Sequence, residues 1–369
     1  MTVADEPGPD VVVREARPAD ADAVAAFARD TWGERHDDYI PRVFPDWADS
    51  DDPDRGTFVA TLSPGAVAVD GLDGRQEGDT VVEGDGSGAA EPGEPEAVVG
   101  CVQGALLSAW EAWAQGIRVD PAARGFGVGT ALSTAALDWA RDRGATVCRN
   151  MVFSWNIAGL GQSRAVGFEP ATEFRFAEPE PSASASTAGL VVTAVDDPDP
   201  NAAWAFWTDS DARDHLRGLV LDDGESWACS ALTRERLRTA ADEDRLLAVR
   251  GSAGAGRPTA LAGIAVRTRV SERTGDGPDR IAIYGVAAWR DVDAAGGIYR
   301  SIAADAAAVG ADAARVLIPE TVEHVSDTGA NRVPVPGEPD FVMSADLTGN
   351  PVGASDLTEE ATGAAEPDE

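Results

Sequence analysis

A run of glycines between an apolar strand and an amphipathic helix is the part of this sequence best suited to chemistry. The run is Ile117-Arg-Val-Asp-Pro-Ala-Ala-Arg-Gly-Phe-Gly-Val-Gly-Thr130. Glycines let the backbone turn so that successive N–H groups point into one concavity, and the positive end of the following helix dipole adds to them. Arg124 can reinforce this cradle, because a guanidinium matches phosphate geometry. The run therefore predicts a site for a pyrophosphate.

A glycine-rich turn from strand to helix has two other interpretations, a purely structural connection and the dinucleotide fingerprint of a Rossmann fold. The Rossmann interpretation needs the motif near the start of a doubly wound sheet, with an acid closing the next strand. Here the run follows four predicted strands, and the next one, Thr146 to Phe153, ends in Ser154-Trp155-Asn156. The structural turn therefore stays as the alternative to anion binding.

Two motifs stand in order along the chain. The first is Arg-x-x-Gly-x-Gly from Arg124 to Gly129, preceded by Val119-x-Pro121, and the second is Asn156 followed by Gly167-Phe168. Together they resemble the GNAT superfamily of acyl-CoA-dependent N-acetyltransferases, over about Val11 to Phe176. The resemblance implies acetyl-CoA as co-substrate, held by Ile117, Val119, Arg124, Gly125, Gly127, Gly129, Thr130 and Asn156.

The resemblance also implies a fold and a mechanism. The fold is a mixed α/β (α+β) sheet that splays between the strand ending at Val119 and the strand starting at Thr146, with acetyl-CoA in the split. A backbone N–H of the first of these strands polarises the thioester carbonyl. A neutral amine attacks directly, so a base takes a proton from the ammonium and an acid protonates the departing thiolate.

The sequence departs from the family at the proton-transfer groups. Gln115 replaces a frequent Glu, and because its amide offers only hydrogen bonds we expect it to bind acceptor or water. Glu111 shares strand parity with Gln115 and is either the base or a solvated strand end. Ser163 stands where the family often has a Tyr that acts as the general acid. A thiolate leaving group, with a pKa of about 8.5, tolerates the loss of that acid. The other candidate bases are Glu34, His36, Asp37 and Asp38.

A narrower resemblance concerns the acceptor. The segment Asp38 to Trp47 (DYIPRVFPDW), with Gln115 to Val119, is similar to vertebrate-type histidine N-acetyltransferases and their relatives, which carry a second half after the catalytic one. This resemblance implies an amino acid as acceptor. Core packing is the alternative explanation of the aromatic residues in the segment.

The second half of the chain repeats the order of the first. A strand (Ile281 to Val286), a helix (Ile298 to Val309) and a strand (Ala314 to Pro319) lie about 166 residues after their counterparts. This offset indicates an internal duplication, with chance similarity of two αβ units as the alternative. Asp291 stands where Arg124 does, with Asp293 beside it. We therefore expect tandem GNAT-like domains, of which the second is degenerate and does not bind CoA.

Composition gives the domain limits. Segments rich in Gly, Pro, Ser, Ala and acids are expected to be unstructured, and Ala177 to Thr187 is one of them. The predicted organisation is a tail (1–10), a GNAT domain (11–176) with an acidic insert (64–97), a linker (177–188), a second domain (189–347) and an acidic tail (348–369).

Charge excludes several functions. The 369 residues carry 64 Asp plus Glu against 30 basic residues, all of them Arg, for a net charge of -34. Without lysine, neither a P-loop nor a Schiff-base mechanism is available. The acidic excess argues against nucleic-acid and membrane partners and predicts a halophilic protein, although a GC-rich genome would also deplete lysine.

The remaining composition points to a soluble, cytoplasmic protein. Three separated cysteines and three scattered histidines support neither disulfides nor a metal site, and no leader or membrane span is expected. The resemblance to the GNAT superfamily implies an acetyl-CoA-dependent N-acetyltransferase that acts on the primary amine of a small molecule. The alternatives are a protein N-terminal acetyltransferase and a non-catalytic acyl-CoA-binding module.

Overall fold

The chain of this computed structural model divides into two compact units. Unit 1 comprises residues 1–148 and 345–369, and unit 2 comprises residues 149–344. The structure describes residues 10–29, 31–33, 38–62, 97–251, 260–272 and 279–349, so nearly all of both predicted tails and of the acidic insert lie outside the described residues. The sequence-based domain limits at 176 and 189 stay a prediction.

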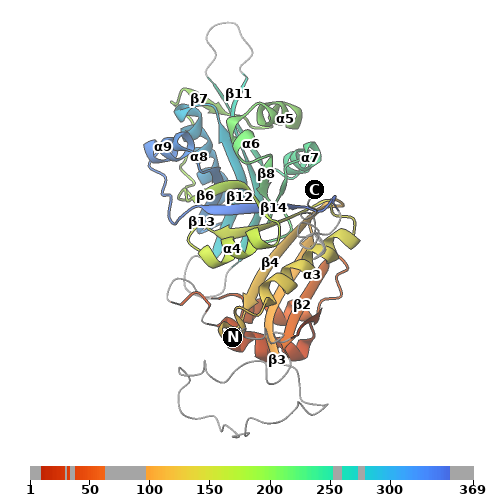
Figure 1. Ribbon diagram of the computed structural model, residues 1–369. Helices are drawn as coiled ribbons and strands as arrows, with labels where there is room; N and C mark the ends of the chain where they lie inside the picture. Colours follow the sequence, from red (N-terminus) through yellow and green to blue (C-terminus); the bar gives the residue numbers. More distant parts are fainter. Residues whose placement is uncertain are drawn as a thin grey trace, which may run out of the picture. The chain divides into compact units, whose positions relative to one another are not determined.

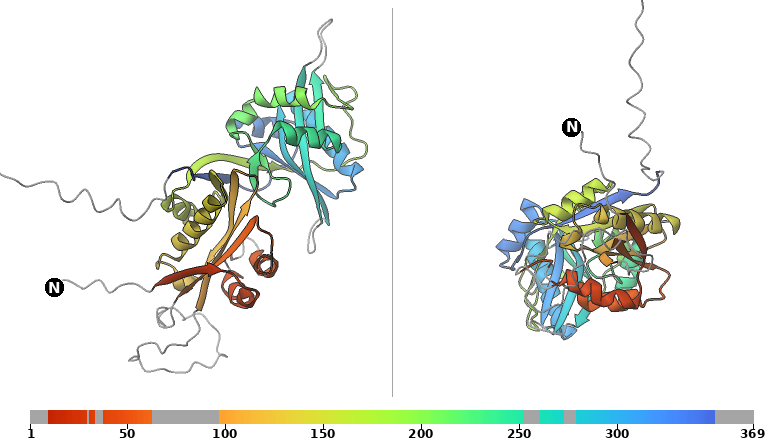
Figure 2. Two further views of the ribbon diagram at one scale, coloured as in Figure 1. Left: turned by 90° about the vertical axis from the view of Figure 1, so that its right-hand side faces the viewer. Right: turned by 60° about the horizontal axis from the view of Figure 1, so that its bottom comes forward.

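Unit 1 is built on an antiparallel sheet with strand order β1-β2-β3-β4. Helix α3 covers one face, and α1 and α2 cover the other (Figure 2). The elements are β1 (Val11–Glu15), η1 (Pro18–Asp20), α1 (Ala21–Ala28), α2 (Ile40–Ala48), β2 (Arg55–Leu62), β3 (Ala97–Leu106), β4 (Glu111–Val119), η3 (Pro121–Ala123), α3 (Val128–Asp142) and the start of β5 (Val147–Phe153).

The packing of α3 against this sheet fixes the position of the glycine run that precedes the helix. Trp139 of α3 lies against β2 and β3 at two glycines. A Cβ on Gly56 would come within 2.4 Å of the indole, and one on Gly104 within 2.8 Å. Only glycine at both positions leaves room for the Trp139 ring. The other buried residues of α3 lie on the same side of the helix and pack against the sheet as well.

Unit 2 contains a mixed sheet with strand order β5-β14-β6-β13-β12-β11-β10-β7. Helix α8 packs on one face, and α5, α6, α7 and the β8–β9 hairpin lie on the other (Figure 1). The elements are α4 (Ile157–Ala165), β6 (Glu169–Ala177), β7 (Val192–Ala194), α5 (Pro200–Thr208), α6 (Asp211–His215), β8 (Leu219–Leu221), β9 (Cys229–Ala231), α7 (Arg234–Asp242), β10 (Leu246–Gly251), β11 (Leu261–Glu272), β12 (Arg280–Trp289), α8 (Val292–Ala308), β13 (Ala313–Pro319), α9 (Val322–Ala330) and β14 (Asp340–Asp346).

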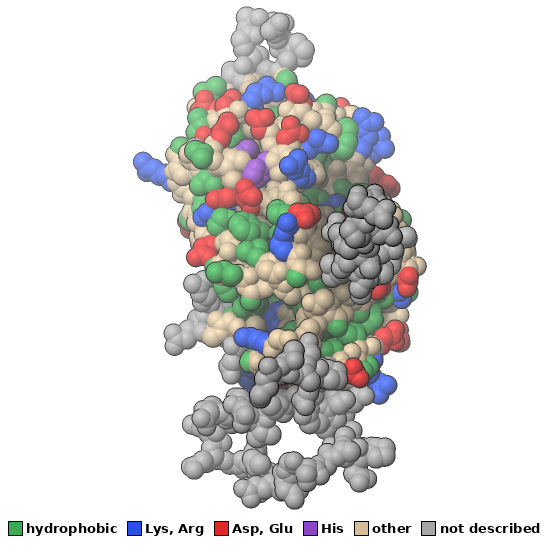
Figure 3. All heavy atoms as spheres, in the orientation of Figure 1, with side chains coloured by type: hydrophobic (Ala, Val, Ile, Leu, Met, Phe, Trp, Pro, Cys, Tyr) green, Lys and Arg blue, Asp and Glu red, His purple; other side chains and the backbone are tan. Residues whose placement is uncertain are grey.

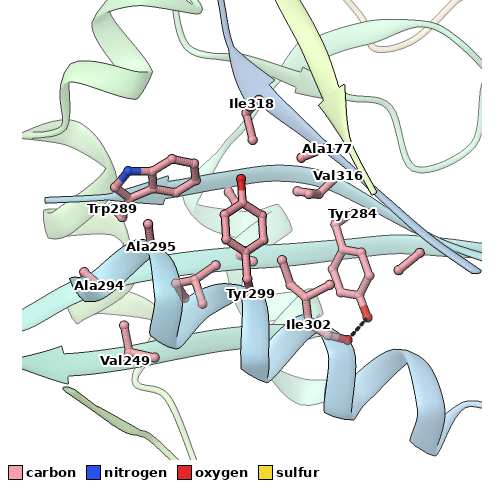
Figure 4. Packing of buried hydrophobic residues seen from close by; sticks show 14 of the residues in the cluster. Ala177, Val249, Tyr284, Trp289, Ala294, Ala295, Tyr299, Ile302, Val316 and Ile318 are labelled. Atoms are coloured by element: carbon pink, nitrogen blue, oxygen red, sulfur yellow. Dashed lines mark hydrogen bonds between the residues drawn. The ribbon is translucent and has the colours of Figure 1, made fainter. Parts of the chain in front are cut away.

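The core of unit 2 lies between α8 and the sheet (Figure 4). Small residues of α8 let the helix approach closely, while Trp289 and Tyr299 pack with ring centroids 5.5 Å apart. The hydroxyl of Tyr284 donates to the Ile302 carbonyl at 3.2 Å and to Asp305 at 2.6 Å, so this buried aromatic is satisfied.

The mixed α/β fold and the repeated element order are confirmed. β5 begins at Val147 and its counterpart β13 at Ala313, which lies 166 residues later. One prediction was wrong. Ala177 to Thr187 is ordered, because Ala177 ends β6, Glu178 pairs with Arg315 at 2.9 Å, and the N–H of Ser182 donates to Ala303 at 2.9 Å. Composition alone missed these partners.

Surface charge and hydropathy complete the description. On the face shown in Figure 3, Arg side chains lie singly among acidic, apolar and uncharged ones rather than in one continuous patch. Within the described part of the chain, no helix combines the length and the apolar run that crossing a membrane requires.

Candidate active site

A β-bulge in β4 sets which side chains share a face of the sheet. Gln115 pairs with Gln103 of β3, but Arg118 pairs with Cys101, so β4 has one extra residue between these pairs. Gly116 at the bulge has a φ of 66°, and a Cβ there would come within 2.7 Å of Trp47. Glycine is therefore required. The bulge turns Arg118, and not its neighbours, to the face of Gln115.

The predicted cradle is the connection from β4 to α3. It begins with Asp120, whose side chain accepts from the N–H of Ala122 at 2.9 Å and starts the turn η3. Gly125 and Gly127 follow with φ values of 87° and 79°, and no atom lies within 4 Å of a Cβ built on either one. Their backbone is left-handed, which costs an L-residue roughly 1–2 kcal/mol. The sequence uses glycine here for conformation and not for close packing.

The N-terminus of α3 is open. Gly127 is its N-cap, and no side chain among the described residues caps it. The first helical hydrogen bond runs from the N–H of Ala131 to Gly127 at 3.0 Å, so the N–H groups of Val128 and Thr130 have no acceptor inside the helix. Arg124 is exposed beside them. The N–H groups, the helix dipole and Arg124 together provide positive potential for an anion.

Gln115 belongs to a chain of hydrogen bonds on the face covered by α1 and α2. Its amide N–H donates to Gln103 at 2.9 Å, Gln103 donates to the hydroxyl of Thr57 at 3.1 Å, and Thr57 donates to the Trp47 carbonyl at 3.2 Å. Gln103 is fully buried. Sequence reasoning missed Gln103 and Thr57, although Gln103 stands out as a lone polar residue in the apolar run of β3. The chain orients the Gln115 amide for hydrogen bonding.

Arg118 and Asp38 form a buried ion pair on the same face. The Arg118 Nε and Nη2 atoms lie 2.6 and 3.0 Å from the two Asp38 oxygens, and the side chains are 7% and 0% exposed. The guanidinium also lies over the rings of Trp32 and Tyr39, at 4.8 and 5.6 Å from their centroids. Asp38 can accept a proton only by breaking this pair, which argues against it as the base. Glu34, His36 and Asp37 lie outside the described residues.

Glu111 lies at the opposite end of β4 from the cradle. Its side chain is 2% exposed and accepts from the hydroxyl of Ser108 at 3.2 Å, in the turn that joins β3 to β4. This burial excludes a solvated strand end. Glu111 lies four positions before Gln115, which is about 13 Å along a strand. A base role for Glu111 stays a prediction.

Asn156 and Ser163 lie on α4 in unit 2. Asn156 is the N-cap of α4 and accepts from the N–H of Gly159 at 3.0 Å. Ser163 is buried, and its hydroxyl accepts from the amide of Asn150 of β5 at 3.1 Å. Sequence reasoning missed Asn150. The cap accounts for Asn156 structurally, so its contact with the cofactor stays a prediction.

The predicted residues thus form two groups. Unit 1 contains the β4 residues Gln115, Ile117 and Val119 near the cradle from Arg124 to Thr130, with Glu111 at the far end of the strand, and unit 2 contains Asn156 and Ser163 at one helix. Among the described residues, no three His, Cys, Asp or Glu side chains cluster as metal ligands.

The cradle, the bulged strand and the Asn156 cap all fall within one family match. Residues 21–161 match the family model of the acetyltransferase (GNAT) family. These residues form a GNAT acetyltransferase domain. The GNAT match runs from α1 into α4, so it crosses the limit between the two compact units at Cys148.

Solved structures share the fold. The GCN5-related N-acetyltransferase from Sphaerobacter thermophilus is 15% identical with a TM-score of 0.54, over 92% of this chain and 97% of that one. A glucosamine N-acetyltransferase region of a fungal multi-domain GH3 β-N-acetylglucosaminidase is 14% identical with a TM-score of 0.51, over 93% and 39%. A tandem GNAT protein of clavulanic acid biosynthesis is 14% identical with a TM-score of 0.46, over 92% and 100%. No curated protein sequence matches the chain.

The GNAT-like second half differs at the turn that corresponds to the cradle. α8 begins at Val292, only two residues after β12, and Asp291 caps it by accepting from the N–H of Ala294 at 2.9 Å. The helix starts six residues before its predicted first residue, Ile298, because this cap replaces the glycine loop. The N-terminus of α8 is therefore already occupied by a carboxylate of the chain itself.

Proposed function

We propose that the chain is an acetyl-CoA-dependent N-acetyltransferase that transfers an acetyl group by direct attack to the primary amine of a small molecule. The observation that carries this proposal is the open cradle of the GNAT domain, where Gly125 and Gly127 hold left-handed backbone before a helix of 15 residues that no described side chain caps. The resemblance to histidine N-acetyltransferases supports an amino acid as the acceptor class.

The residues present fit a CoA pyrophosphate. Arg124 offers the paired N–H donors of a guanidinium, and the exposed glycines let a phosphate come close to the backbone N–H groups. A Cβ at Gly125 or Gly127 would occupy space that is now open. Thr130 and Gly129 extend the cradle, and Ile117 and Val119 supply the strand backbone toward the pantetheine. Acetyl-CoA, when bound, supplies an acetyl group that is activated as a thioester.

Cys101, on the face of the sheet that carries Gln115 and Arg118, is not a nucleophile. Burial raises the pKa of Cys101 to about 12, and its thiol donates weakly to the Gly116 carbonyl at 3.7 Å. The thiolate is therefore scarce at neutral pH, which favours direct attack by the amine over an acyl-cysteine route. Gln115 positions acceptor or water through its amide, and Ser163 hydrogen-bonds the departing sulfur.

We also propose a cytoplasm of high salt as the setting, on the basis of the net charge of -34 and the absence of lysine. Strong screening relieves the self-repulsion of such a chain, since the Debye length at molar salt is about 3 Å. The second half is proposed to be a degenerate GNAT-like domain of residues 189–347 that does not bind CoA.

Thiol release from acetyl-CoA in molar KCl tests the proposal against its alternatives. The acceptor panel contains L-histidine and other amino acids, a polyamine, glucosamine and a peptide with a free N-terminus. We expect turnover with at least one small amine. Turnover with the peptide alone would indicate a protein N-terminal acetyltransferase. Tight acetyl-CoA binding without turnover on any amine would indicate a binding module and refute the enzymatic function.

A further inference from the structure

Three polar side chains form a row across the sheet of unit 1, on the face that α1 and α2 cover. Thr57 of β2 lies directly opposite Gln103 of β3, and Gln103 lies directly opposite Gln115 of β4. Side chains at such opposite positions are close enough to touch. We refer to Thr57, Gln103 and Gln115 as the polar row. Its last member lies on β4, the strand that leads into the cradle.

The hydrogen-bond direction of the polar row is set at its other end, by a backbone carbonyl of α2. The carbonyl of Trp47 can only accept, so the one hydroxyl hydrogen of Thr57 is given to it, at 3.2 Å. Thr57 must therefore accept from Gln103, which turns its NH2 group toward Thr57 at 3.1 Å and its oxygen toward Gln115. Gln115 in turn must donate with its NH2 group, at 2.9 Å.

Burial enforces this direction. Gln103 is fully buried and Thr57 is 9% exposed, so the protein itself has to supply their hydrogen-bond partners. A reversed amide at Gln103 would set its oxygen beside a hydroxyl whose hydrogen is already given away, and its NH2 group beside the NH2 group of Gln115. The cost of such buried mismatches keeps the reversed arrangement at roughly a tenth of the population or less.

The direction of the polar row decides which end of the Gln115 amide faces away from it. In a planar amide the oxygen and the NH2 group lie on opposite branches, so the oxygen is on the branch that does not face Gln103. Gln115 is partly exposed and lies two positions before Ile117 on β4. The polar row therefore presents a hydrogen-bond acceptor, rather than a donor, from the strand that leads into the cradle of the same unit.

We propose that Thr57 and Gln103 are positioning residues for the acetyl acceptor, because they hold the oxygen of Gln115 in the orientation that accepts a hydrogen bond from the N–H of the acceptor amine. This inference rests on the proposed function. An amine that donates its N–H to Gln115 keeps its nitrogen lone pair available for attack. A reversed amide would direct its own N–H at that lone pair, or at the N–H groups of an ammonium, and would hinder the reaction in both cases.

The assignment gives Gln115 a role that requires no proton transfer. An amide oxygen accepts hydrogen bonds but does not act as a base at neutral pH. The chemistry selected by the polar row is that of an N–H donor, which a primary amine and its ammonium form both provide.

Steady-state kinetics of a Thr57 pair test the inference, with acetyl-CoA and the amine of the panel that gives the highest turnover. Thr57→Val removes the hydroxyl and with it the fixed direction, so kcat/KM for the amine should fall roughly 10-fold while the KM for acetyl-CoA stays unchanged. Thr57→Ser keeps the hydroxyl and should keep a rate near that of the wild type.

Thr61→Val is the matched control for stability. Thr61 is also a buried threonine of β2, and its hydroxyl also donates to a backbone carbonyl, that of Val12 at 3.4 Å, but it is not part of the polar row. Thermal unfolding should show a similar loss of stability in Thr57→Val and Thr61→Val. Only Thr57→Val should lower kcat/KM for the amine.

A double-mutant cycle asks whether Thr57 acts through Gln115. Gln115→Ala removes the oxygen and should itself lower kcat/KM for the amine. Adding Thr57→Val to Gln115→Ala should cause no further loss of kcat/KM, because no amide remains to be oriented.

Each failure has a distinct form. A wild-type protein that acetylates no amine overturns the proposed function and, with it, the role of the polar row. An active wild type with a Thr57→Val variant of equal kcat/KM overturns this inference alone. Equal kinetic losses in Thr57→Val and Thr61→Val, or losses that multiply in the double variant, would show that Thr57 does not orient Gln115 and would also overturn it.

Discussion

The two halves of the chain differ most at the turn from a strand into the long helix that follows it. In the first half, eight residues separate β4 from α3, and the helix starts at Val128 after the N-cap Gly127, with no cap from the side chains that the structure describes. In the second half, two residues separate β12 from α8, and Asp291 caps the helix. The same strand–turn–helix frame can therefore leave a helix N-terminus open for a ligand anion or close it with a carboxylate of its own.

The glycines of the two halves differ in purpose as well. Gly125 and Gly127 provide left-handed backbone in open space. Gly296 and Gly297 lie inside α8, where a Cβ would come within 2.4 Å of Asn331 and of Val192, respectively. Glycine at the first turn permits backbone to approach a ligand, whereas glycine in α8 permits the helix to approach its own sheet and loops.

The largest effect is expected for Gly127→Glu. The variant adds left-handed strain and places a carboxylate at the open N-terminus, so the Kd for acetyl-CoA should rise at least about 100-fold, or roughly 3 kcal/mol. Titration calorimetry in molar KCl measures it. Gly144→Glu is the matched control, because Gly144 has a φ of 90° and equally open space at the other end of α3. Equal losses in both variants would refute the cradle.

A smaller effect, on stability alone, is expected for Gly297→Ala. The added methyl group meets Val192 and should lower the free energy of unfolding by roughly 1–3 kcal/mol, with an unchanged Kd for acetyl-CoA. Denaturant titration measures it. Gly329→Ala is the control, because it also lies in a helix but has no atom within 4 Å of its Cβ, and it should stabilise by roughly 0.5–1 kcal/mol. Weakened acetyl-CoA binding in Gly297→Ala would contradict the packing role.

The smallest effect is expected for Asp291→Ala. Loss of the cap should lower the free energy of unfolding by about 1 kcal/mol, while Asp291→Asn keeps a cap and should stay within a few tenths. Calorimetry should show one acetyl-CoA per chain for both variants. A second bound acetyl-CoA in Asp291→Ala would show that the capping carboxylate alone closes this site.

The sequence by itself determined the features that depend on neighbours along the chain. The order of strands and helices follows from local apolar periodicity, and the cradle follows from glycines whose left-handed backbone is needed within one short turn. The repeated element order was visible for the same reason, and β13 begins 166 residues after β5. The carboxylates at Asp291 and Asp293 also foretold that the second turn differs from the first.

The tertiary structure decided which distant groups meet. The bulge at Gly116 places Arg118 on the face of Gln115, and strict alternation along the strand gives the opposite result. Arg118 then meets Asp38, which is 80 residues away and was a candidate base until this pairing was known. Gln103 links Gln115 to β2 only because β2, β3 and β4 pair in this register. Register, burial and partner distance control these outcomes, and they depend on contacts that local sequence patterns do not encode.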